Sequence, residues 1–167
     1  MKKEQFKKIN QNNYKQALKW IVKILKENNI KFNVVGGLAA YAQGSKRMLV
    51  DIDISVIFKD MKRLTKLAKD HVIEKPWNGT NSTSQWRGYY MELNYKGIAI
   101  EIGELSKSQY FNKKSGKWEH FPDDLKYSVN KKVFGLIVPV LSKKKLIDYK
   151  SKLRREVDLI DLKNLKN

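Results

Sequence analysis

Two aspartates, Asp51 and Asp53, alternate with apolar residues in the run from Met48 to Phe58, a pattern typical of a β-strand with one acidic face. Both carboxylates should lie on that face, close enough to share a cation. Two such charges ~4 Å apart repel by about 4 kcal/mol at an effective dielectric constant near 20, and a divalent cation would remove this cost. Ligation by oxygen alone suits Mg²⁺ or Mn²⁺. An acidic strand face can also serve solubility, so the pair alone leaves both interpretations open.

Two glycines, Gly36 and Gly37, follow the apolar run from Phe32 to Val35 and precede helix-prone sequence from Leu38 to Gln43. Glycine lets the backbone turn sharply and lets a ligand approach without a Cβ in the way. A helix that starts there would direct free N–H groups and the positive end of its dipole at the ligand, which suits a triphosphate. Two other phosphate-binding motifs are excluded, because Gly44-Ser45-Lys46 inverts the Walker order and no third glycine completes a dinucleotide fingerprint.

Taken together, these segments resemble the signature of the nucleotidyltransferase superfamily, of the DNA polymerase beta-like and minimal, antitoxin-associated types. The signature is an apolar residue, two small residues, a spacer and Asp-x-Asp, and here it reads Val34-Val35-Gly36-Gly37, then Leu38 to Val50, then Asp51-Ile52-Asp53-Ile54. The superfamily also has a third carboxylate on a later strand. Glu101, within the run from Ile98 to Ile102, matches it, and Glu92 and Glu104 compete for the role.

The resemblance implies an α+β nucleotidyltransferase fold with a central mixed β-sheet flanked by helices and with helices at the C-terminus. It also implies transfer of a nucleoside monophosphate from a nucleoside triphosphate to a hydroxyl group, with release of pyrophosphate. Asp51, Asp53 and Glu101 would be the catalytic and Mg²⁺-binding or Mn²⁺-binding residues. The residues implied to bind the phosphates of the nucleotide are Gly36, Gly37, Ser45, Arg47, Lys150 and Arg154.

The C-terminal part of the chain resembles the same minimal members, through Phe121-Pro122-Asp123-Asp124-Leu125 and the run from Val138 to Ser142. Lys150 and Arg154 are four residues apart and would share one face of a helix that begins after Ser142, where a solvated stripe is an equal alternative. Two acids of this part are expected to form structural ion pairs with neighbouring cations of the tail. They are Asp158 and Asp161, and the candidate partners are Arg154, Arg155 and Lys163.

The elements that must position these residues follow from periodicity and from turn residues. Helices are expected over residues 13–29, 38–43 and 59–70, and again after Ser142 with a break near Arg154 or Glu156. Pro76 to Ser84, rich in Asn, Gly, Ser and Thr, is predicted to be a functional loop for a base or an acceptor. Strands are expected over 32–35, 48–58, 71–74, 87–94, 97–103 and 132–140, with a second hairpin over 111–121.

The composition indicates one nucleotidyltransferase-like domain over residues 1–167, with an N-terminal helix (1–30), a catalytic core (31–140) and C-terminal helices (141–167). The chain lacks cysteine and any apolar stretch of membrane-spanning length, which favours a cytoplasmic location without membrane contact.

The net charge of +18 favours an anionic partner, so RNA with a tRNA-like end is the first acceptor to consider beside the nucleoside triphosphate. The alternatives are a small hydroxyl compound such as an aminoglycoside, a protein side chain, or a non-catalytic relative related to antitoxins or binding nucleic acid. Three retained acids in a basic chain argue against the non-catalytic alternative. The oligomeric state is not predicted.

Overall fold

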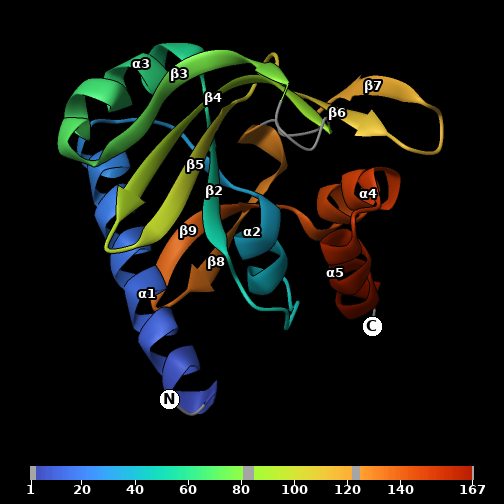
Figure 1. Ribbon diagram of the computed structural model, residues 1–167, viewed down its shortest axis with the longest axis horizontal. Coiled ribbons are helices and arrows are strands. Elements are labelled where there is room, and N and C mark those ends of the chain that lie inside the picture. Colours follow the sequence, from blue (N-terminus) through green and yellow to red (C-terminus); the bar gives the residue numbers. More distant parts are fainter. Residues whose placement is uncertain (1–2, 81–84, 122–124, 167) are drawn as a thin grey trace.

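The computed structural model describes residues 3–80, 85–121 and 125–166, in which a mixed β-sheet packs against α-helices (Figure 1). The helices are α1 (Lys3–Glu27), α2 (Gly36–Ala42), α3 (Phe58–Leu67), α4 (Lys143–Leu153) and α5 (Glu156–Lys166), with short 3₁₀ turns η1 (Lys69–His71) and η2 (Leu125–Tyr127). The strands are β1 (Asn33–Val34), β2 (Asp51–Val56), β3 (Val72–Thr80), β4 (Trp86–Tyr95), β5 (Ile98–Glu104), β6 (Gln109–Asn112), β7 (Lys117–His120), β8 (Ser128–Val133) and β9 (Leu136–Leu141). This confirms the expected α+β fold, with a mixed sheet flanked by helices and with helices at the C-terminal end.

The sheet places β2 at its centre. Its order is β7-β6-β4-β5-β2-β1-β9-β8, and β3 pairs with β4 beside this path. β2 runs parallel to β5 and antiparallel to β1, while β1 runs parallel to β9. The C-terminal helices follow directly on β9, so this topology brings the end of the chain back to the strand that carries the two aspartates.

Side-chain alternation divides the central strands into an apolar and an acidic face. Ile52 and Ile54 of β2, with Ile100 and Ile102 of β5, are almost fully buried. α1 contacts β5, and α3 contacts β3 and β5. α2 contacts β2 as well as α4 and α5, and Figure 1 shows it between the sheet and the C-terminal helices.

Three sequence-based assignments of secondary structure need correction. The expected single strand over 132–140 is a hairpin of β8 and β9, which turns at Phe134 and Gly135, both with positive φ. Residues 76–80 of the predicted loop belong to β3, because they pair with β4 despite the turn-rich composition, and residues 81–84 lie outside the described part. The first helix starts before residue 13, at Lys3. Within the expected Phe121 to Leu125 motif, residues 122–124 also lie outside the described ranges.

Candidate active site

Three carboxylates from two neighbouring strands converge on the acidic face. Asp51 and Asp53 are two residues apart on β2, and Glu101 of β5 is paired in register with Asp53. One oxygen from each of the three side chains lies within 4.8 Å of the others. Asp51 and Asp53 are half-buried and Glu101 is exposed. The strand pattern of the sequence therefore predicted the face, and the parallel pairing of β2 with β5 brings the third acid to it.

The glycine pair lies directly against this cluster. The Gly37 N–H donates a hydrogen bond to Asp53 Oδ2 at 3.3 Å. At Gly36 the φ angle is +58°, and a Cβ there would lie 1.7 Å from Asp53 Oδ2. A Cβ on Gly37 would lie 2.3 Å from an Arg47 guanidinium nitrogen. Gly36 therefore requires glycine, because of its left-handed backbone and its close approach to Asp53, whereas a side chain at Gly37 would displace the Arg47 guanidinium.

The three carboxylates of the cluster repel one another. Burial, and then the charges of Asp51 and Glu101, raise the pKa of Asp53 well above its ordinary value. Burial raises the pKa of Asp51, while Arg47 and Arg155 act in the opposite direction. Burial raises the pKa of Glu101, assisted by the charges of Asp51 and Glu92. A hard divalent cation would relieve this repulsion, and an all-carboxylate donor set with this spacing fits Mg²⁺ or Mn²⁺.

Acidic residues continue outward from the cluster in one row across the sheet. Asp53 is in register with Glu101, Glu101 with Glu92 of β4, and Glu92 with Glu74 of β3. Glu104 does not belong to this row, because it lies on the opposite face of β5. Its buried carboxylate accepts hydrogen bonds from the backbone N–H groups of Ser106 and Lys107. Of the two competitors of Glu101, only Glu92 shares its face.

An aromatic pair flanks the acidic row. Trp77 of β3 is in register with Tyr90 of β4, and their rings meet edge to face with centroids 4.6 Å apart. The Tyr90 hydroxyl donates a hydrogen bond to the Gly79 carbonyl oxygen at 2.6 Å. Burial, followed by the charges of Glu74 and Glu101, raises the pKa of Tyr90. The row and the aromatic pair therefore form one continuous polar and aromatic surface beside the carboxylate cluster.

Three of the six residues that the resemblance assigned to phosphate binding converge instead on one buried carboxylate, Asp161 of α5. Ser45 Oγ donates to Asp161 Oδ1 at 2.6 Å, and Arg47 Nε lies 2.9 Å from the same oxygen. Lys150 Nζ lies 3.0 Å from Asp161 Oδ2 and 3.0 Å from Asp158 Oδ1. Lys150, Asp158 and Asp161 have fully buried side chains. These contacts tie the C-terminal helices to the segment between α2 and β2.

Lys150 and Arg154 do not share a helical face. α4 ends at Leu153, and Arg154 caps it in the left-handed conformation with φ +54°, so its side chain leaves the helix pattern. Arg155 pairs with Asp158 instead, through Nε at 2.8 Å and Nη2 at 3.1 Å. The expected structural ion pairs of Asp158 and Asp161 are therefore present, but of the expected partners only Arg155 takes part within the described residues, and Lys150 and Arg47 supply the other pairs. Sequence analysis assigned no site role to Arg155.

A cavity of about 390 Å³ lies away from the carboxylates, at the ends of β3 and β4. Its lining residues come from β3, β4 and the start of β6, together with the loop before it, and include Thr80, Arg87, Tyr89 and Lys107. None of the acidic row is among them. We assign this cavity no role.

Comparison with known proteins places this geometry among nucleotidyltransferases. The sequence profile of the aminoglycoside-2''-adenylyltransferase family matches residues 17–165. No curated protein sequence matches the chain. A Thermotoga maritima protein described as a nucleotidyltransferase has a similar structure, with 25% sequence identity, a TM-score of 0.67 and 84% coverage of each chain.

Two further solved structures are similar in fold. The lincosamide antibiotic adenylyltransferase LnuA, solved with lincomycin, shares 19% identity at a TM-score of 0.57, covering 91% of this chain and 96% of LnuA. ANT(2'')-Ia, solved with adenylyl-2''-tobramycin, shares 13% identity at a TM-score of 0.61, covering 91% of this chain and 87% of its own. At these identities the similarity is one of fold.

Proposed function

The chain belongs to the aminoglycoside-2''-adenylyltransferase family, and from that premise we propose that it transfers the adenylyl group of ATP to a hydroxyl group of a cationic small molecule of the aminoglycoside class. The observation that carries this proposal is the convergence of three carboxylates beside the glycine pair, Gly36 and Gly37. That donor set suits nucleotidyl transfer, in which charge on a phosphate must be held and offset.

In the proposed reaction each residue has a defined task. Gly36 and Gly37 leave room for the phosphates to approach, and the Gly37 N–H orients Asp53. The acceptor oxygen forms a bond to the α-phosphorus, the bond from that phosphorus to the leaving oxygen breaks, and pyrophosphate departs. Glu101, the exposed member of the cluster, accepts the hydroxyl proton. A divalent cation held by Asp51, Asp53 and Glu101 would offset charge on the entering and leaving oxygens.

The acidic row supports a cationic acceptor. Glu92 and Glu74 continue from the cluster on the face where an acceptor must approach, so negative charge lines the route to Glu101. Carboxylates attract the ammonium groups of a ligand and repel its phosphates when the two come close together. Trp77 and Tyr90 add a flat apolar surface of the kind that lines small-molecule sites. Net charge alone favoured RNA, but the local charge beside the cluster has the opposite sign to the one a polyanion needs.

The proposal is tested by incubating the purified protein with Mg²⁺ and α-labelled ATP against aminoglycosides, a lincosamide and total RNA in separate reactions. We expect label on an aminoglycoside. Asp51→Asn and Asp53→Asn should each abolish the transfer while the variants remain folded, as judged by circular dichroism. Label on RNA but on no antibiotic would disprove the acceptor class, and undiminished transfer by either variant would disprove the site.

The acidic row is tested separately with Glu92→Gln. This substitution should raise KM for the cationic acceptor about tenfold, the size of one lost charge-assisted hydrogen bond, while the affinity for ATP stays unchanged. Glu27→Gln, at an exposed ion pair with Lys23 on α1, is the matched control and should leave both constants unchanged. An unchanged KM in Glu92→Gln would mean that the row does not contact the acceptor.

A further inference from the structure

Of the three cations that the resemblance assigned to the nucleotide, none is both held in place by the fold and free to contact a phosphate. A triphosphate brings several negative charges beside three carboxylates. A single divalent cation cannot offset all of this charge. Lys150 cannot supply the charge, because its side chain is fully buried between Asp158 and Asp161. Arg154 is exposed, and no contact of its side chain occurs within the described ranges. Arg47 is largely engaged, by Asp161 through Nε and by the Met48 carbonyl oxygen through Nη1.

Arg155 differs from these cations because only one edge of its guanidinium is engaged. Nε and Nη2 face the buried carboxylate of Asp158, and the Arg155 backbone N–H also donates to Asp158 Oδ2 at 3.0 Å. Arginine carries five N–H donors. No described residue accepts a hydrogen bond from Nη1, Cζ lies 5.9 Å from the Trp86 ring centroid, and the side chain as a whole retains 31% exposure. The residue is therefore a fixed, partly exposed cation whose Nη1 can still donate a hydrogen bond.

A network of buried ion pairs holds the Arg155 guanidinium in place. Lys150 bridges Asp158 and Asp161, and Asp161 in turn holds Arg47, whose guanidinium lies against Gly37. Burial alone would raise the pKa of Asp158, but the Arg155 hydrogen bond and the Lys150 charge lower it, so the carboxylate stays ionised. One buried ion network thus joins Arg155 to the glycine pair. A guanidinium held in this way loses little freedom when it binds a phosphate.

Position indicates which phosphates this cation would meet. In phosphoryl transfer the entering and leaving oxygens lie roughly in line on opposite sides of the phosphorus. The acceptor side is the acidic row, which runs from β2 through β5 and β4 to β3. Arg155 follows α4, which contacts α2 as well as β6, and its Cζ lies 5.9 Å from the ring centroid of Trp86 at the start of β4. The ion network of Asp158, Lys150, Asp161 and Arg47 connects Arg155 to Gly37, where the proposed function has the phosphates approach.

Resting on the proposed function, we propose that Arg155 is a substrate-contacting residue that binds the β- and γ-phosphates of ATP and the pyrophosphate product, while Lys150 and Asp158 serve as positioning residues that hold it. The one-sided ion pair with Asp158, the partial exposure of the side chain and the ion network that joins it to the glycine pair carry this assignment.

The test compares ATP, AMP and pyrophosphate binding by calorimetry in the presence of Mg²⁺ for Arg155→Gln, Arg155→Lys and the matched control Arg63→Gln, which removes an Arg–Asp pair of the same i,i+3 spacing on α3. In Arg155→Gln the affinities for ATP and pyrophosphate should fall about tenfold to a hundredfold, while AMP, which lacks the β- and γ-phosphates, should bind as before. Arg155→Lys keeps the charge but loses the paired N–H donors of the guanidinium, so its affinities should lie between those of the wild type and Arg155→Gln. Arg63→Gln should change all three affinities by less than about twofold.

A purely structural role would lower ATP and AMP affinity equally together with the melting temperature, and that result would overturn the assignment. So would undiminished ATP affinity in Arg155→Gln when the wild-type protein binds ATP and transfers label. If Arg155→Gln does not fold, the same comparison of ATP with AMP in Arg155→Lys decides. A wild-type protein that binds no ATP at all would instead refute the proposed function, and this inference with it.

Discussion

Asp53 carries a charge that the folded chain disfavours in the absence of a cation. Its pKa is raised, so the folded state binds the proton more tightly than the unfolded state does. The stabilising effect of that proton is complete below the ordinary pKa and is lost as the pH rises through the raised value. At neutral pH, therefore, the ionised carboxylate reduces the free energy of unfolding.

Asp53→Asn should accordingly raise the melting temperature in metal-free buffer at pH 7 to 8, and the gain should shrink towards zero as the pH approaches about 4. Mg²⁺ should raise the melting temperature of the wild-type protein but not that of the variant. Asp70→Asn, at an exposed carboxylate on η1, is the control and should give no pH-dependent difference. A variant that is less stable than the wild type across this range would contradict the electrostatic account.

At the residue scale, the sequence predicted those features of the site that are set by residues close together in the chain. Asp51 and Asp53 were assigned to one face from alternation alone, and the glycines from their place after an apolar run. The choice between Arg154 and Arg155 could not be made in this way, because it depends on one left-handed residue that ends α4 and shifts the next side chain towards Asp158. No feature of the Arg154-Arg155 dipeptide marks this break, although the expected interruption near Arg154 was correct.

At the scale of elements, α4 and α5 act as a clamp on the segment that leads from the glycine pair to β2. Asp161 accepts from Ser45 and Arg47 in that segment and pairs with Lys150 of α4. Every one of these contacts is long-range or between helices. The clamp therefore fixes the approach to β2 from a part of the chain that lies more than a hundred residues away in sequence.

Asp161→Asn should break this clamp. Removing one partner of a buried ion pair costs about 3 to 5 kcal/mol, which corresponds to a fall in melting temperature on the order of 10 °C. Asp148→Asn is the matched control, because Asp148 forms an exposed pair with Lys152 on α4 and should cost less than about 1 kcal/mol. Thermal unfolding followed by circular dichroism measures both. Equal effects of the two substitutions would show that the clamp contributes nothing beyond a surface ion pair.

Element prediction was most reliable where periodicity was strong. The helix around Leu18 and Ile21 and the hairpin of β4 and β5 were found from pattern alone. β3 was missed beyond Glu74, because Pro76 and the Asn, Gly and Thr residues that follow indicate a turn, and only pairing with β4 overrides that preference. The hairpin of β8 and β9 was read as one strand, since Phe134 gives no turn signal before Gly135. Tertiary pairing decided both cases.

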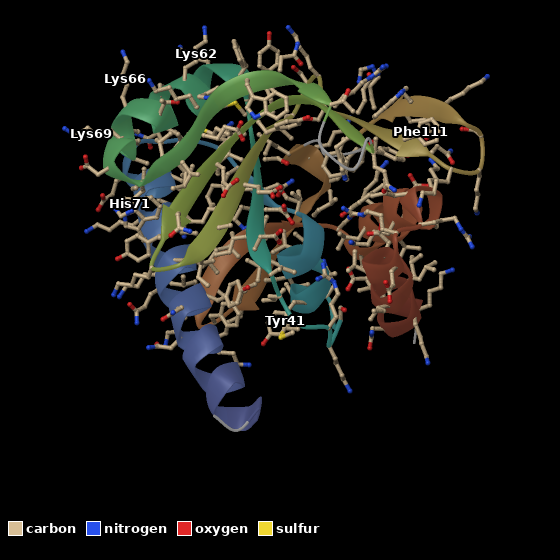
Figure 2. All side chains as sticks on the ribbon, in the orientation of Figure 1. Tyr41, Lys62, Lys66, Lys69, His71 and Phe111 are labelled. Carbon is tan, nitrogen blue, oxygen red and sulfur yellow. The ribbon has the colours of Figure 1, made fainter. Side chains whose placement is uncertain are left out.

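At the scale of the whole molecule, positive and negative charge are separated. The net charge of +18 resides largely on helix surfaces, such as that of α3 and η1, where Lys62, Lys66 and Lys69 point outward (Figure 2). α1 adds Lys15, Lys19 and further exposed lysines. The acids of the carboxylate cluster and of the row, in contrast, share one face of β2, β5, β4 and β3. Composition alone could not predict this local cluster of negative charge, because it depends on cross-strand register, and net charge therefore favoured RNA rather than the cationic acceptor proposed above. No described helix is long and apolar enough to cross a membrane.

The clamp also bears on the order in which the chain is synthesised. The two carboxylates that hold Arg47, Lys150 and Arg155 belong to α5, which follows the glycine pair, the carboxylate cluster and α4 in the sequence. A nascent chain that already exposes those earlier parts still lacks the anions that neutralise these three cations. The nucleotide site is therefore complete only once α5 has been synthesised and has docked.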